Sequence, residues 1–285
     1  MERQPYSTDL SDKEWELLVP FIPAPLPGGR PAKWERREIV NAILYVLRTG
    51  CQWHLLPHDF PPYQTVFYYF RQWRRSGVWE QVNTALREQF RVQSGRNAQP
   101  SAAIIDSQSV KTAEKRGLKG YDGGKKVKGR KRHILVDTNG LLLKIVVHTA
   151  ELSESEGGCL VLLGLMNLFP RLRHLWTDQG YKPVFVTWVE QHLGWTVEVV
   201  KPPYTPRGDT AQAMRELLGE EEFARRYPGG FQVLPRRWVV ERTFAWFGKQ
   251  RRLSKDYELL PRTTETWAYL TMGRLLLRRL AAANA

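Results

Sequence analysis

The chain has few cysteines and no long hydrophobic run. Its two cysteines, Cys51 and Cys159, lie far apart, so neither a disulfide framework nor a cysteine metal cluster is expected. No apolar stretch reaches the ~18 residues that span a bilayer, and no basic segment followed by an apolar one marks a secretory signal. Internal repeats and low-complexity tracts are also missing. We therefore expect a cytoplasmic, reduced protein with no membrane partner.

Acidic residues are in short supply. The 285 residues include 43 Lys and Arg against 29 Asp and Glu, which gives a formal net charge of +14. A surplus of this size indicates a polyanionic partner, with nucleic acid ahead of a membrane surface.

The first ~95 residues have helical periodicity. Ser11 and Glu14 form a capping box, and helices are expected at residues 35–48, 63–75 and 78–91. The helix at 63–75 directs Val66, Phe70 and Trp73 inward. Its opposite face carries polar side chains suited to base edges, as in a helix-turn-helix unit: Gln64, Tyr68, Arg71, Gln72 and Arg75. The alternative is a helical bundle with a solvated face.

A polar linker at residues 92–100 leads into a mixed region. The patterns predict strands at 102–106, 133–137, 141–148, 175–178 and 195–200, and helices at 153–168, 183–193, 209–226, 236–249 and 264–282. An antiparallel meander followed by alternating strands and helices is the element order of a ribonuclease-H-like fold. The expected fold class is thus mixed α/β, preceded by an all-α, helix-turn-helix-like domain.

Residues 111–132 are strongly basic and rich in glycine, so we expect a loop there. The run follows Asp106 closely, which favours a phosphate-gripping role over a merely solvated loop. Its candidate DNA contacts are Lys125, Lys126, Lys128, Arg130, Lys131 and Arg132.

The helix at 236–249 carries one carboxylate among cations. Val240, Phe244 and Phe247 would face the core, while Arg237, Glu241 and Ala245 share another face. Taken alone, Glu241 is best explained as a surface residue paired with Arg237 or Arg242.

Two aspartates change that interpretation. Asp106 and Asp178 each end an apolar strand, and neighbouring strands would bring them to one edge of the sheet beside Glu241. Three clustered carboxylates repel unless cations neutralise them, and hard oxygen ligands suit Mg²⁺ or Mn²⁺. Two such ions ~4 Å apart can activate a water or a sugar hydroxyl and stabilise the leaving oxygen in phosphoryl transfer.

Several segments then resemble one family, the DDE transposases of bacterial insertion sequences with a compact catalytic domain. They are residues 105–111 (IDSQSVK), 126–137 (KVKGRKRHILVD), 177–181 (TDQGY) and 235–246 (PRRWVVERTFAW), with 50–53 (GCQW), 56–57 (LP) and 63–66 (YQTV) in the N-terminal third. The motifs occur in the family's order and cover nearly the whole chain.

The resemblance implies that Asp106, Asp178 and Glu241 are catalytic metal ligands for Mg²⁺, with Mn²⁺ as a substitute. It implies a DNA-binding domain at residues 1–98 and a ribonuclease-H-like domain at 99–285 with a helical insertion near 203–235. The expected partners are double-stranded DNA, as terminal inverted repeats and target DNA, and a second copy of the chain on paired ends. Such a protein acts at the bacterial nucleoid. Further candidate DNA contacts are Arg237, Lys249, Arg251 and Arg252.

One departure from the family pattern stands out. Related transposases carry Tyr, Arg and Lys at set distances around the glutamate. Arg237 fits the arginine position, but the tyrosine position falls on Leu234 and the lysine position on Gly248, with Lys249 next. Residues expected for hairpin or base-clamping steps are therefore missing at two of the three positions.

Other polar and aromatic residues have simpler explanations. His133, His148 and His174 lack metal-ligand spacing, and Asp137 would initiate the turn at 138–140. The tryptophans at 176 and 246 fit core packing better than base stacking.

Two rival functions remain open from the sequence. The first is a ribonuclease-H-like DNA nuclease without strand transfer. The second is a DNA-binding regulator whose catalytic site is inactive, although the presence of all three carboxylates argues against it.

Overall fold

The computed structural model describes residues 3–24, 33–113, 116–165, 168–201, 204–227 and 236–283. Its N-terminal part is helical, as expected, with α1 (Asp12–Leu18), α2 (Arg36–Thr49), α3 (Tyr63–Arg75) and α4 (Val78–Gln93). Short 3-10 helices lie at Val19–Phe21 and Trp53–Leu55. The capping box of Ser11 and Glu14 is present, and α2 ends at Gly50 with a φ of 70°, a conformation that favours glycine.

The sheet consists of β1 (Ala102–Lys111), β2 (Gly120–Asp122), β3 (Val127–Asp137), β4 (Leu142–Thr149), β5 (His174–Thr177) and β6 (Thr196–Val199). Its order is β2-β3-β1-β5-β6, and β4 also pairs with β3. The strands β1, β3 and β4 form an antiparallel meander, whereas β5 pairs parallel to β1 and β6 parallel to β5. This mixture confirms the ribonuclease-H-like fold expected from the element order.

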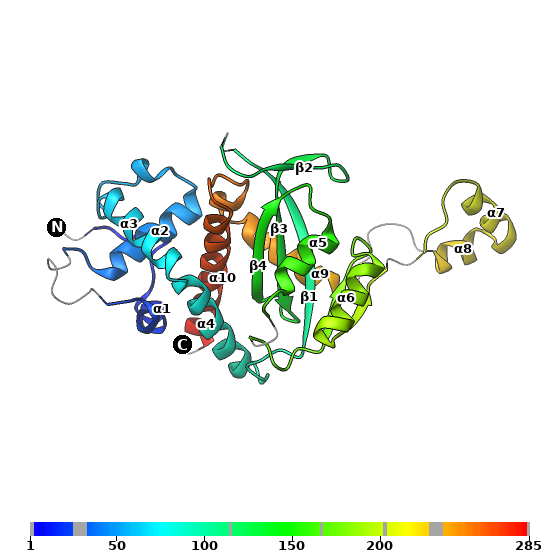
Figure 1. The fold of residues 1–285 in the computed structure, drawn as a ribbon, viewed down its shortest axis with the longest axis horizontal. Coiled ribbons are helices and arrows are strands. Elements are labelled where there is room, and N and C mark those ends of the chain that lie inside the picture. The colour runs from blue at the N-terminus through cyan, green and yellow to red at the C-terminus, as the bar shows by residue number, and fades with distance from the viewer. Residues whose placement is uncertain are drawn as a thin grey trace.

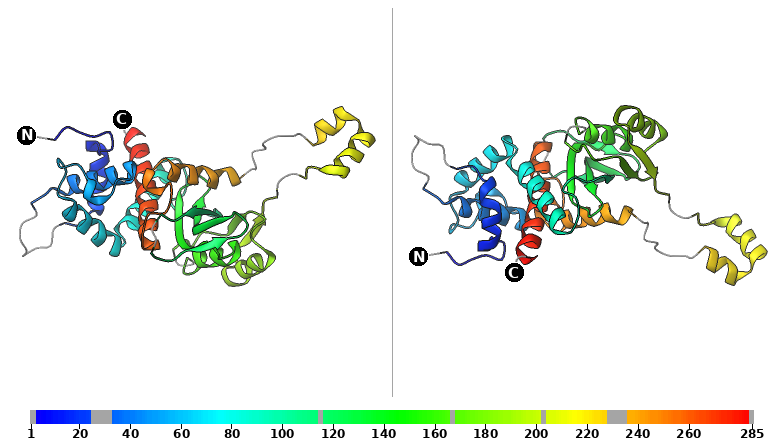
Figure 2. Two further views of the ribbon diagram at one scale, coloured as in Figure 1. Left: turned by 90° about the horizontal axis from the view of Figure 1, so that it is seen from above. Right: turned by 90° about the horizontal axis from the view of Figure 1, so that it is seen from below.

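The remaining helices follow the expected order. They are α5 (Glu154–Leu162), α6 (Pro183–Leu193), α7 (Gly208–Leu218), α8 (Glu220–Arg226), α9 (Arg237–Gly248) and α10 (Pro261–Ala283), with a 3-10 turn at Arg251–Leu253. Figures 1 and 2 draw α7 and α8 away from the sheet. Among the described residues, no helix is both long and apolar enough to cross a membrane.

Two hydrophobic cores cover the two faces of the sheet. On one face Ile104 and Ile134 pack with α9, α10 and the N-terminal helices, and on the other Ile105 and Leu135 pack with α5 and α6. Figure 1 shows α10 standing between the N-terminal helices and the sheet. Because side chains alternate along a strand, Asp106 shares the α9 face with Ile104, and Ser107 shares the α5 face with Ile105.

The first of these cores crosses the expected domain boundary. Trp267 of α10 is fully buried and stacks on Phe70 of α3, with 4.4 Å between ring centroids. The division of the chain into two domains at residues 98 and 99 therefore remains a proposal. We expect the N-terminal helices to need packing against α10 to complete their hydrophobic core.

The structure corrects three element boundaries. The first strand continues five residues past Asp106, and the segment expected as a loop contains the end of β1, β2 and the first half of β3. The helix expected at 153–168 ends at Leu162. The predictions for β1 and β3 were too short because they depended on an apolar pattern. The polar and basic residues of these two strands lack that pattern.

Candidate active site

Asp106 and Asp178 lie side by side on neighbouring parallel strands. The last paired residues of β1 and β5 are Ile104 and Trp176, so each aspartate stands two positions further along its strand. Asp178 directly follows β5, which ends one residue earlier than expected, whereas Asp106 lies within β1, where that strand has passed the end of β5. The meeting of the two carboxylates at one sheet edge is thus explained by the parallel register.

Glu241 approaches from α9. The buried Val240, Phe244 and Phe247 fix one face of this helix against the core, as the periodicity predicted. That packing turns Arg237 and Glu241 toward the two aspartates, since residues four apart share a helix face.

One guanidinium nitrogen joins the three acids. Nη2 of Arg237 lies 4.0 Å from Asp106 Oδ2, 3.7 Å from Asp178 Oδ2 and 3.7 Å from Glu241 Oε1. The simple ion pair of Glu241 with Arg237 therefore exists, but the same arginine also reaches both aspartates. Arg242 instead donates to the carbonyl of Asn139 at 2.9 Å.

The cluster has more negative charge than its arginine can balance. Burial raises the pKa of Asp106 to about 7, and the neighbouring Asp178 carboxylate adds to the rise, while the Ser107 N–H, Arg237 and Lys125 act against it. A second source of positive charge would relieve this imbalance.

The donor set fits a hard divalent cation, because carboxylate oxygens are the ligands that Mg²⁺ and Mn²⁺ prefer. Among the described residues, however, no three acidic, His or Cys side chains are already spaced to enclose a metal ion. Nη2 of Arg237 lies within 4.0 Å of all three carboxylates, so its positive charge already interacts with these oxygens. A cation bound to the same oxygens would compete with Arg237.

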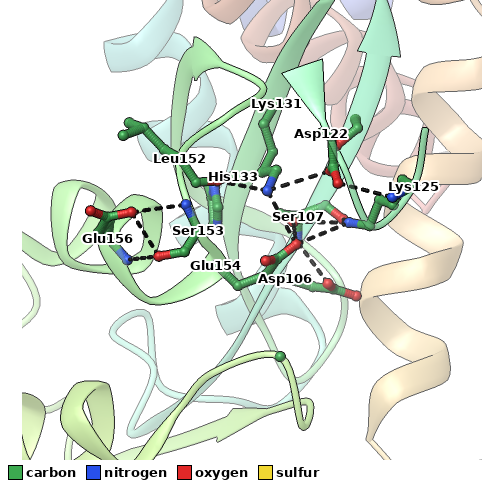
Figure 3. A network of polar contacts seen from close by, with 12 residues as sticks. Asp106, Ser107, Asp122, Lys125, Lys131, His133, Leu152, Ser153, Glu154 and Glu156 are labelled. Carbon is green, nitrogen blue, oxygen red and sulfur yellow. Dashed lines mark hydrogen bonds and ion pairs between the residues drawn. The ribbon is translucent and has the colours of Figure 1, made fainter. Parts of the chain in front are cut away.

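A second charged cluster adjoins the triad (Figure 3). Glu154, the first residue of α5, contacts Ser107, Lys125 and Lys131, and Lys131 also contacts Asp122. Sequence reasoning missed Glu154. The usable signal was the capping box of Ser153 and Glu156, which the structure confirms and which places Glu154 in the first helical turn.

The basic segment after Asp106 divides into two sets. At the β2–β3 turn and the start of β3, the side chains of three basic residues are exposed: Lys125, Lys126 and Lys128. Further along β3, the side chains of three more are buried: Arg130, Lys131 and Arg132. Their burial corrects the expectation that these three contact phosphates.

Each buried cation has protein partners. Arg130 pairs with Asp256 at 3.1 Å, and Arg132 donates to the carbonyl of Leu253 at 2.8 Å. Lys131 donates to the carbonyl of Leu152 at 2.7 Å. These three side chains hold the sheet to its surroundings and are not available to DNA.

The candidate DNA contacts after α9 also fall into an exposed and a buried group. Lys249 and Arg251 are exposed, but Arg252 is buried and pairs with Glu258 at 2.7 Å. Arg252 is therefore structural. Leu234, at the family's tyrosine position, lies outside the described residues.

The outward face of α3 matches the sequence prediction. Val66, Phe70 and Trp73 are buried. On the other side Gln72 is half-buried, and the remaining members of the predicted face are exposed: Gln64, Tyr68, Arg71 and Arg75.

The non-catalytic explanations hold for the other polar residues. His133 and His148 are buried and hydrogen-bonded to each other at 2.8 Å, and His174 contacts Thr196 Oγ1 at 2.7 Å. The Asp137 carboxylate accepts from the N–H groups of Asn139 and Leu141, which confirms its turn role.

Both tryptophans considered for base stacking pack against the core. Trp176 and Trp246 are partly buried there, and Trp176 also donates to Glu198 at 2.9 Å. Core packing is therefore confirmed as their role in this structure.

Comparison with known proteins gives partial relatives. An "Insertion element IS402 uncharacterized 16.2 kDa protein" of Burkholderia cepacia is 29% identical over 110 residues, covering 36% of this chain and 72% of that protein. "Uncharacterized protein y4sN" of Sinorhizobium fredii is 29% identical over 77 residues, covering 27% of this chain and 62% of that protein.

Among solved structures, the "Mos1 transposase paired-end complex with left transposon end" covers 92% of this chain and 82% of its own, at 12% identity and a TM-score of 0.24. The "Mos1 Strand Transfer Complex" has 13% identity and a TM-score of 0.22, covering 92% of this chain and 81% of its own. Scores this low carry no argument about this chain.

The family comparison is decisive. Residues 10–83 match the family described as "Putative transposase of IS4/5 family", and residues 97–276 match "Transposase DDE domain". The second match spans more than half of the chain and contains Asp106, Asp178 and Glu241. The chain belongs to the DDE transposase family.

Proposed function

We propose that Asp106, Asp178 and Glu241 are the metal-ligating catalytic residues of this transposase. The observation that carries the proposal is the approach of all three carboxylates to one Arg237 nitrogen, within 4.0 Å. Divalent-metal dependence belongs to the family, and the oxygen-only donor set favours Mg²⁺, with Mn²⁺ as a substitute.

The bound metal would supply positive charge at the reacting phosphate and at the attacking and leaving oxygens. The chain's own contribution is placement. The pairing of β1 with β5 fixes two carboxylates relative to each other, and α9 brings the third. Arg237 holds the three together until substrate and metal enter.

The reaction then has two steps. Water attacks the phosphodiester at the transposon end, and the freed 3′-hydroxyl attacks a phosphodiester of target DNA. No side chain of the site needs to form a covalent bond to DNA, because hydrolysis leaves the nucleophile for the second step on the DNA itself.

Positive side chains around the site supply the DNA grip. We assign the phosphate contacts to exposed residues near the sheet edge and the end of α9, namely Lys125, Lys126, Lys128, Lys249 and Arg251. We assign recognition of the terminal repeat to the outward face of α3, where Arg and Gln suit guanine and adenine edges. Arg237 joins the DNA contacts only after it leaves the carboxylates.

The partners that follow are the terminal inverted repeats, target DNA and a second copy of the chain on paired ends. Action on the bacterial chromosome places the protein in the cytoplasm, at the nucleoid.

A strand-joining assay tests this function. The protein is incubated with Mg²⁺, a labelled duplex carrying the inverted repeat that flanks its gene, and a target plasmid. Transposition predicts cut ends and covalent end–plasmid products. Cut ends without joined products would leave a nuclease, and binding without any cutting would leave a DNA-binding regulator.

A further inference from the structure

A lysine beside the triad is held in a fixed position. Nζ of Lys125 contacts the carbonyl and the hydroxyl of Ser107 and Oε1 of Glu154, each at 3.3 Å. A surface lysine ordinarily keeps its rotamer freedom, and ordering it costs side-chain entropy. Three acceptors around one ammonium group offset that cost.

The ammonium group remains accessible. The Lys125 side chain is 44% exposed, so it can meet a ligand that enters from solvent. Lys201, which follows β6 at the far edge of the sheet, is also exposed but makes none of these contacts. The two lysines carry the same charge, and only Lys125 belongs to the cluster.

Glu154 anchors the arrangement from α5. Its Oε1 lies 3.3 Å from Lys125 Nζ and 3.3 Å from Lys131 Nζ. Lys131 is buried and also lies 3.5 Å from Asp122 Oδ2. Lys131 therefore holds the Glu154 carboxylate in place, and Glu154 in turn holds Lys125.

Two links connect this cluster to the triad. Ser107 follows Asp106 directly, and its N–H donates to Asp106 Oδ1 at 2.6 Å. On the other side, a Cβ added to Gly180 would lie 3.0 Å from Asp178 Oδ1 and 3.2 Å from Glu154 Cγ, so these two acids border the same glycine. The cluster that holds Lys125 therefore adjoins Asp106 through Ser107 and Asp178 through Gly180.

We propose that Lys125 is a catalytic residue whose ammonium group contacts a non-bridging oxygen of the reacting phosphate, and that Glu154 and Ser107 are its positioning residues. The proposal rests on the proposed function of the triad. In the hydrolytic step a water oxygen forms a bond to phosphorus while the bond from phosphorus to the 3′ oxygen breaks. Water gives up a proton and the departing 3′ oxygen takes one, so Lys125 neither gives nor takes a proton in this step.

A pair of lysine variants tests the role of Lys125. Single-turnover cleavage of the inverted-repeat duplex at saturating protein is compared for Lys125→Ala, Lys125→Arg and the charge control Lys201→Ala. Both alanine variants lose one charge, and saturating protein removes differences in DNA affinity from the measured rate. The cleavage rate should fall ~100-fold for Lys125→Ala, as for loss of one preorganised donor, and less than ~3-fold for Lys201→Ala, with partial activity in Lys125→Arg.

A double-mutant cycle with Glu154→Gln tests the positioning role. Glu154→Gln should slow cleavage in the wild-type background but cause no further loss when Lys125 is already alanine. Equal rates for the two alanine variants would overturn the catalytic role of Lys125, and additive losses would overturn the positioning role of Glu154. A wild-type protein that cuts no end DNA would instead refute the proposed function, and this role with it.

Discussion

The buried carboxyl of Asp106 makes the stability of the metal-free protein depend on pH. Its pKa is about 7 in the folded chain against an ordinary value of 3.8. Below pH ~4 the group is protonated in both states and its ionisation costs the fold nothing. As pH rises to about 7 the unfolded chain loses this proton first, so the folded state becomes progressively less stable.

The magnitude follows from the pKa difference. Each unit of pKa corresponds to about 1.4 kcal/mol, so ionised Asp106 costs the fold on the order of 4 kcal/mol above pH 7. Asp106→Asn removes the ionisation and keeps an oxygen for the Ser107 N–H. Since 1 kcal/mol shifts the melting temperature of a protein of this size by roughly 2–4 °C, the variant should melt roughly 8–16 °C above wild type at pH 8 and within a few degrees of it at pH 4.5.

Thermal melting in EDTA at the two pH values measures the effect, with Asp209→Asn as an exposed control that changes the charge equally. Added Mg²⁺ should raise the melting temperature of the wild type at pH 8 and raise that of Asp106→Asn much less. A variant that is no more stable relative to wild type at pH 8 than at pH 4.5 would refute the reasoning.

Three further predictions concern the cations and the outward face of α3. Alanine at the three exposed lysines Lys125, Lys126 and Lys128 should weaken binding to all DNA sequences alike and reduce the salt slope by up to ~0.9 per lost contact; an unchanged slope in gel-shift titrations would show these lysines to be merely solvated. Arg237→Ala should tighten Mg²⁺ binding in calorimetry, because a competing cation is lost, and unchanged or weaker binding would contradict that competition. Gln64→Ala with Arg71→Ala should lower the preference for the inverted repeat over random duplex by roughly tenfold or more; equal losses on both DNAs would place specificity elsewhere.

Local sequence patterns predicted much of the helical structure. The apolar spacing of Val240, Phe244 and Phe247 correctly oriented α9, and with it the side chain of Glu241. The capping boxes at Ser11 and Ser153 marked the starts of α1 and α5. These features depend on residues within a few positions of one another, so periodicity and capping chemistry suffice to find them.

Features set by distant residues were not predictable in this way. Arg130 and Arg132 look like surface cations in the sequence, but their partners lie more than 120 residues later, at Asp256, Leu253 and Lys255. Likewise, β1 continues past Asp106 because β3 pairs with it as far as Lys111. A local pattern carries no signal for either arrangement.

The site itself was predictable only in part. The two aspartates could be placed at the ends of apolar strands, but not those strands beside each other, and the family resemblance joined both aspartates to Glu241. The contact of Arg237 with both aspartates, and the attachment of Lys125 to Glu154, depend on where β1, α5 and α9 meet in space.

The central claim is that Asp106, Asp178 and Glu241 act together on DNA phosphates through bound metal. The most direct measurement compares Mg²⁺-dependent cleavage of inverted-repeat DNA with gel-shift affinity for Asp106→Asn, Asp178→Asn and Glu241→Gln. Each amide removes one ligand charge while keeping side-chain shape, so cleavage should be abolished and DNA affinity nearly unchanged. Substantial cutting by any of the three variants would remove that residue from the triad and contradict the account.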